Sequence, residues 1–130
     1  MGVIKAAVCK EFGKLLSIEN IILRDPQDGE IEVTLEACAV CYSDISCIDG
    51  GWGGTLPAVY GHEAVGKISK LGSGTYGYEI NDRVLLTLIR ACGDCIPCST
   101  GAPTQCSEPY DRTNGPITML DGSRLEHGLA

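Results

Sequence analysis

The sequence has few basic residues and no long apolar run. Lysine and arginine together number 10 against 17 aspartates and glutamates, so the 130-residue chain has a formal net charge of −7. Phosphate binding needs a basic surface, so we expect no nucleic acid among its partners. The apolar run RVLLTLI, residues 83–89, is too short to cross a bilayer, and we expect no membrane partner either.

The first residues lack the features of a targeting segment. MGVIKAAVCKEFGK contains no apolar stretch of signal-peptide length, and Ala6 stands where a myristoylation motif has serine or threonine. We therefore predict a cytoplasmic location, where thiols stay reduced. Of the eight cysteines, the isolated Cys9, Cys38 and Cys47 are then expected to be small buried apolar side chains and not members of disulfides.

Short apolar segments separated by turn residues predict a mainly β fold. The segments with the length and composition of strands are residues 4–9, 15–23, 30–40, 64–71 and 82–89. In the third of them, Ile31, Val33 and Leu35 alternate with polar residues, which predicts one buried face. Strands at this spacing with glycine-rich turns favour a barrel or sandwich over alternating strands and helices.

Two shorter patterns complete this interpretation. Residues 42–49, YSDISCID, could form a short helix. Residues 117–130 are expected to form a hairpin that turns at Asp121 and Gly122. The second arm stops at Ala130 where a strand should continue, so we expect the chain to be a fragment.

The hexapeptide GSGTYG, residues 72–77, matches the spacing Gly-x-Gly-x-x-Gly of dinucleotide-binding turns. That motif needs a helix directly after the glycines, because the helix N-terminus holds the pyrophosphate. The following residues, YEINDRV, contain turn residues and then a strand pattern. We therefore expect a loop between two strands and no cofactor site here.

Four of the eight cysteines lie in one loop, ACGDCIPCSTGAPTQC, residues 91–106. Zinc prefers four soft ligands, and Cys-x2-Cys pairs place two sulfurs on one ion from a tight turn. Four thiolates would close the coordination shell, which is typical of a structural site. An iron–sulfur cluster also takes four cysteines, so both metals stay open at this point.

A second group of ligand-type residues lies upstream, in CAVCYSDI and GHEAVG. Cys41 and His62 are residue types that bind zinc, and Glu63 could bind the metal or lie behind it. Asp44 could orient His62 by accepting a hydrogen bond from its second ring nitrogen.

The two groups together resemble the zinc-dependent medium-chain alcohol dehydrogenases. The matching order is Cys-x2-Asp at residues 41–44, Gly-His-Glu at 61–63, Asn-Asp-Arg-Val at 81–84 and the four-cysteine loop at 92–106. The resemblance extends over about residues 5–130, nearly the whole chain. It implies that residues 1–130 form a GroES-like barrel with a zinc-binding loop, truncated at its C-terminal end and lacking the Rossmann domain.

The resemblance also implies two zinc ions. The structural ion would be held by Cys92, Cys95, Cys98 and Cys106. The catalytic ion would be held by Cys41 and His62, with Glu63 as an exchanging or nearby carboxylate. The Ser43 hydroxyl would relay the alcohol proton, although the same hydroxyl could cap the short helix.

The implied activity is hydride transfer between a small alcohol or aldehyde and NAD or NADP. The nicotinamide cofactor would be bound mainly by the missing domain, so we expect the chain alone to be inactive. The full-length protein is expected to be a homo-oligomer. The alternative is a non-catalytic, zinc-stabilised barrel that acts as a binding module.

Overall fold

The computed structural model describes residues 1–89, 91–108 and 115–128. Its strands are β1 (Gly2–Val8), β2 (Ser17–Leu23), β3 (Ile31–Cys38), β4 (Ala58–Tyr60), β5 (Ala64–Leu71), β6 (Arg83–Leu86), β7 (Ile117–Met119) and β8 (Glu126–Gly128). Its helices are α1 (Tyr42–Ile48), α2 (Ile96–Ser99) and the 3-10 helix η1 (Pro103–Gln105). No helix in these parts of the chain is long and apolar enough to span a membrane.

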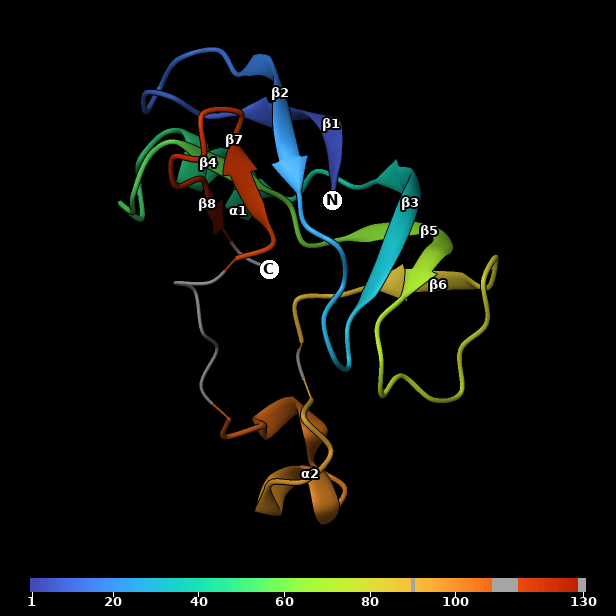
Figure 1. Cartoon of the computed structure of the whole chain (residues 1–130). Helices are drawn as coiled ribbons and strands as arrows, with labels where there is room; N and C mark the ends of the chain where they lie inside the picture. The colour runs from blue at the N-terminus through green and yellow to red at the C-terminus, as the bar shows by residue number, and fades with distance from the viewer. Residues whose placement is uncertain (90, 109–114, 129–130) are drawn as a thin grey trace.

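The strands form three small sheets, which confirms the mainly β prediction (Figure 1). One sheet has the antiparallel order β1-β2-β7 and another has the antiparallel order β3-β5-β6. The third consists of β4 and β8, which run parallel. The expected strands at residues 4–9, 15–23, 30–40, 64–71 and 82–89 correspond to β1, β2, β3, β5 and β6, and the helix expected at 42–49 is α1.

A small apolar core lies between the first sheet and the β4–β8 pair. Val8, Ile21 and Leu125 are buried there. Cys9 and Cys47 are buried as expected, at 1% and 5% exposure. The prediction for Cys38 was wrong, because this cysteine ends the outer strand β3, whose residues from Thr34 onward are exposed.

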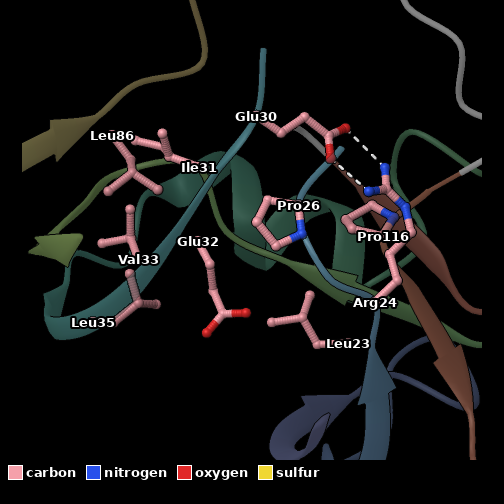
Figure 2. Close-up of a pocket in the computed structure, with 10 residues that line it drawn as sticks. All are labelled: Leu23, Arg24, Pro26, Glu30, Ile31, Glu32, Val33, Leu35, Leu86 and Pro116. Atoms are coloured by element: carbon pink, nitrogen blue, oxygen red, sulfur yellow. Dashed lines mark hydrogen bonds and ion pairs between the residues drawn. The ribbon is translucent and has the colours of Figure 1, made fainter. Parts of the chain in front are cut away.

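The buried face predicted for β3 is also wrong. Ile31 and Val33 are half-buried and Leu35 is 54% exposed. These side chains line an open pocket of about 510 Å³ together with Leu86 of β6 (Figure 2). Alternation correctly places the apolar side chains on one face, but the pocket that this face lines with Leu23 of β2 is left open.

The hairpin expected at residues 117–130 forms only in part. The Gly122 N–H donates to the Met119 carbonyl over 3.0 Å, and Thr118 bridges Arg124, so the turn lies where it was predicted. The second arm then leaves β7, and β8 pairs with β4 instead. The Glu126 N–H donating to the Pro57 carbonyl starts that pairing.

The GSGTYG segment, residues 72–77, is a loop between β5 and β6, as expected. The residues after it contain a turn with Asn81 at φ +75°, followed by β6. No helix follows these glycines, so the segment lacks the context of a dinucleotide-binding turn.

Candidate functional site

The first site candidate is built around the N-terminus of α1. Cys41 is the N-cap of this helix, in extended backbone conformation. Its backbone N–H donates to the Asp44 carboxylate over 2.9 Å, which ties the first turn together. Ser43 lies inside the first turn, so the alternative in which Ser43 caps the helix is wrong.

His62 lies in the loop between β4 and β5 and faces Asp44. The His62 Nδ1–H donates to the Asp44 Oδ1 over 3.1 Å, and Asp44 is only 4% exposed. The hydrogen bond predicted between Asp44 and His62 is therefore present. Holding the proton on Nδ1 leaves Nε2 with a lone pair, the form in which imidazole binds metals.

Cys41, His62 and Glu63 come together as a cluster of donor atoms. Each offers one sulfur, nitrogen or oxygen, and these atoms lie within 4.8 Å of one another. The His62 Nε2 and Glu63 Oε1 are 3.4 Å apart. Cys41 and His62 are half-buried and Glu63 is exposed, so the cluster opens to solvent on one side. This donor set suits a zinc-like ion that keeps a free coordination position.

Hydrogen bonds in this cluster favour a thiolate at Cys41. Hydrogen bonds from the Ser43 hydroxyl and backbone N–H lower the pKa of Cys41, and His62 adds to the effect. Burial alone would lower the pKa of His62, but the Cys41 sulfur and the Asp44 carboxylate outweigh it and raise that pKa.

The four cysteines of the loop form the second candidate metal centre. Their sulfurs lie within 4.8 Å of one another. The Cys92 and Cys98 sulfurs are 4.0 Å apart, and the Cys95 and Cys106 sulfurs are 3.9 Å apart. Four sulfurs at tetrahedral corners around one ion, with bonds of about 2.3 Å, would be about 3.8 Å from each other. The spacing thus fits a single ion, whereas sulfide and several irons between the thiolates would push them farther apart.

Local turns bring these sulfurs together. Gly93 has φ +86°, and the Cys95 N–H donates to the Cys92 sulfur over 3.3 Å. Hydrogen bonds from the backbone N–H groups of Ser107 and Cys98 hold the pKa of Cys95 down at about 6. A thiolate at neutral pH is the form that binds metal.

The lobe that carries these cysteines, residues 91–108, stands apart from the sheets. Figure 1 shows α2 and its neighbouring turns at one end of the molecule, away from the strands. In the described residues, α2 packs against η1 and makes no extensive contact with any strand. None of the described residues 91–108 is buried, so the lobe has almost no apolar core of its own.

The family model of the alcohol dehydrogenase GroES-like domain matches residues 27–128 of this chain. The chain belongs to the zinc-type medium-chain alcohol dehydrogenase family. The GroES-like fold expected for this dehydrogenase-family chain is thereby confirmed.

Relatives of this dehydrogenase-family chain include two bacterial alcohol dehydrogenases. One from Geobacillus stearothermophilus is 36% identical over 126 residues, which are 95% of this chain and 36% of that protein. One from Moraxella sp. (strain TAE123) is 40% identical over 129 residues, which are 97% of this chain and 37% of that protein. The chain thus spans little more than a third of these relatives.

Solved structures agree with the fold. An alcohol dehydrogenase zinc-binding domain protein from Burkholderia ambifaria superposes with a TM-score of 0.87 at 28% identity, over 97% of this chain and 36% of that one. Benzyl alcohol dehydrogenase from Acinetobacter calcoaceticus gives a TM-score of 0.76 at 30% identity, over 98% of this chain and 35% of that one.

Proposed function

We propose that these 130 residues are the zinc-binding, GroES-like catalytic portion of an NAD(P)-dependent alcohol dehydrogenase. The observation that carries the proposal is the open donor cluster, in which Cys41, His62 and Glu63 converge while Asp44 hydrogen-bonds the ring of His62. A barrel that needs metal only for folding has no use for a second, open donor set. This argues against the non-catalytic binding module.

In this proposal the chain's own residues hold and prepare the reacting group. Cys41 and His62 would bind the catalytic zinc, with Glu63 nearby as an exchanging carboxylate. When bound, the ion would supply Lewis-acid chemistry that lowers the pKa of an alcohol. Asp44 would keep the proton on Nδ1 of His62. The Ser43 hydroxyl, two residues after Cys41, would take up the alcohol proton and pass it to solvent.

The four-cysteine lobe would hold a structural zinc ion. Support comes from the near-tetrahedral spacing of its sulfurs and from the lack of buried residues among 91–108. NAD or NADP would be bound mainly outside this chain, because GSGTYG is a loop between strands. Small alcohols or aldehydes are the proposed substrates, in keeping with the names of the relatives.

We expect the purified chain to bind two divalent ions, one at each donor cluster. Titration of the metal-free chain with Co²⁺ should give two saturating steps with thiolate-to-metal absorbance. His62→Ala should remove one step, because the open cluster then keeps a single half-buried ligand. The matched control is Cys38→Ser, an exposed cysteine outside both clusters, which should keep both steps. A single step in the unaltered chain, unaffected by His62→Ala, would refute the catalytic-zinc proposal.

Asp44→Asn should weaken ion binding at the open cluster by about 10- to 100-fold, the usual cost of losing a partner of a ligating histidine. The asparagine side chain lacks the negative charge of the carboxylate that accepts hydrogen bonds from the Cys41 N–H and the His62 Nδ1–H. Asp49→Asn, at the exposed C-cap of the same helix, is the control. Competition with a chromophoric chelator measures both affinities, and equal values for the two variants would contradict the orienting role.

A further inference from the structure

The C-terminal end of α1 is in close contact with the loop between β1 and β2. The Gly13 N–H in that loop donates to the Ile48 carbonyl over 2.9 Å. Phe12, the only phenylalanine of the chain, lies against Gly50. A Cβ atom on Gly50 would be 2.9 Å from the Cγ of the Phe12 ring, closer than side chains approach each other. Glycine is therefore what lets this loop meet the end of the helix.

Gly50 also has a backbone conformation that favours glycine. Its φ is +81°, and its N–H donates to the Cys47 carbonyl over 3.0 Å, which ends the helix. One residue thus both terminates α1 and provides the space that the Phe12 ring occupies.

The orientation of α1 depends on such contacts. The helix has seven residues, too few to be stable by itself in water. It packs against β4, and only Asp44 and Cys47 are buried along it. A shift at its C-terminal end would be transmitted along a rigid helix to Asp44, one turn and a half earlier, and hence to the 3.1 Å hydrogen bond with His62.

We propose that Phe12 and Gly50 are positioning residues for the open metal cluster: their contact sets the orientation of α1 and so aims Asp44 at His62. The inference rests on the proposed function, because it concerns the same ligands. Neither residue belongs to the donor cluster, so both act through Asp44.

The test compares Gly50→Ala with Gly122→Ala. Both glycines have φ +81°, so both variants carry the same backbone strain, but a Cβ on Gly122 has no atom within 4 Å. Only Gly50→Ala should push the β1–β2 loop and α1 apart. We expect it to weaken Co²⁺ binding at the open cluster about tenfold or more, while binding at the four-cysteine lobe stays unchanged. Gly122→Ala should leave both steps unchanged.

A second measurement works without metal. The ¹H–¹⁵N spectrum of the neutral His62 ring reports which nitrogen carries the proton. The unaltered chain and Gly122→Ala should hold it on Nδ1, and Gly50→Ala should give a mixture of both forms. In a Phe12→Ala background, adding Gly50→Ala should cause no further loss, because the ring that requires the space is gone.

Equal effects of the two glycine variants on Co²⁺ binding, or an unchanged His62 ring spectrum in Gly50→Ala, would overturn the inference. So would full additivity of Phe12→Ala and Gly50→Ala. A chain that binds no Co²⁺ at Cys41 and His62 would instead refute the proposed function, and the His62 spectrum would still decide whether the contact positions Asp44.

Discussion

Replacing Cys98 by serine is expected to abolish tight zinc binding at the lobe and to unfold the lobe while the sheets stay folded. The apparent free energy of zinc binding in small structural sites is about 10–16 kcal/mol. That is comparable to the whole stability of a domain, about 5–15 kcal/mol. Because α2 packs against η1 and hardly against the strands, the loss should be confined to the lobe.

Hydrogen exchange can show which part of the chain unfolds in this variant. The N–H groups of residues 99–102 donate to carbonyls within the lobe, and they should exchange at the rate of unfolded chain in Cys98→Ser. Amides in β1, β2 and β5 should keep their protection. After mild dialysis, which should empty the open cluster, elemental analysis should find about one zinc in the unaltered chain and none in the variant. Neither protein should show the visible absorbance of an iron–sulfur cluster.

The control is a cysteine-to-serine substitution in the open cluster. Cys41→Ser should leave exchange in the lobe and its zinc content unchanged, because Cys41 lies outside the lobe. Collapse of the lobe in both variants would contradict the division into a closed and an open centre. A brown, iron-containing protein would refute the assignment of zinc.

The 130 residues alone are expected to show no detectable alcohol oxidation or aldehyde reduction with NAD or NADP. Hydride transfer requires the nicotinamide within about 3–3.5 Å of the substrate carbon, and positioning of this kind lowers a barrier by about 7–11 kcal/mol. Without it, rates fall by roughly 10⁵- to 10⁸-fold. The glycine-rich loop at residues 72–77 lacks the helix that a cofactor turn needs.

The activity of the isolated chain is measured by nicotinamide absorbance with a panel of primary and secondary alcohols and aldehydes. The positive control is a chimera in which residues 1–128 replace the matching part of the Geobacillus stearothermophilus enzyme. We expect the chimera to turn over and its His62→Ala variant to lose that turnover. Activity of the isolated chain that His62→Ala abolishes would show that the cofactor binds within these residues. A chimera that binds cofactor but stays inactive would favour the non-catalytic barrel.

The sequence predicted the ligand residues of both donor clusters because ligand chemistry leaves a local signature. The spacing of Cys92, Cys95 and Cys98 and the Gly-His-Glu at residues 61–63 can be identified without any fold. The positions of β1, β2, β3, β5 and β6 were likewise predictable, since alternation and turn residues are properties of adjacent positions, but the three-residue strand β4 was not predicted. The convergence of Cys41 with His62 was inferred only through the family resemblance.

What covers each face was decided by the tertiary structure alone. The alternating pattern correctly predicted that Val33 and Leu35 share one face of β3. It could not predict that this face lines an open pocket or that Cys38 is exposed. The turn near Gly122 was predicted, yet the partner of β8 was not, because β4 lies more than fifty residues earlier. Burial, strand partners and the contact of Phe12 with Gly50 depend on residues far apart in the chain, and no local pattern records which distant segments meet.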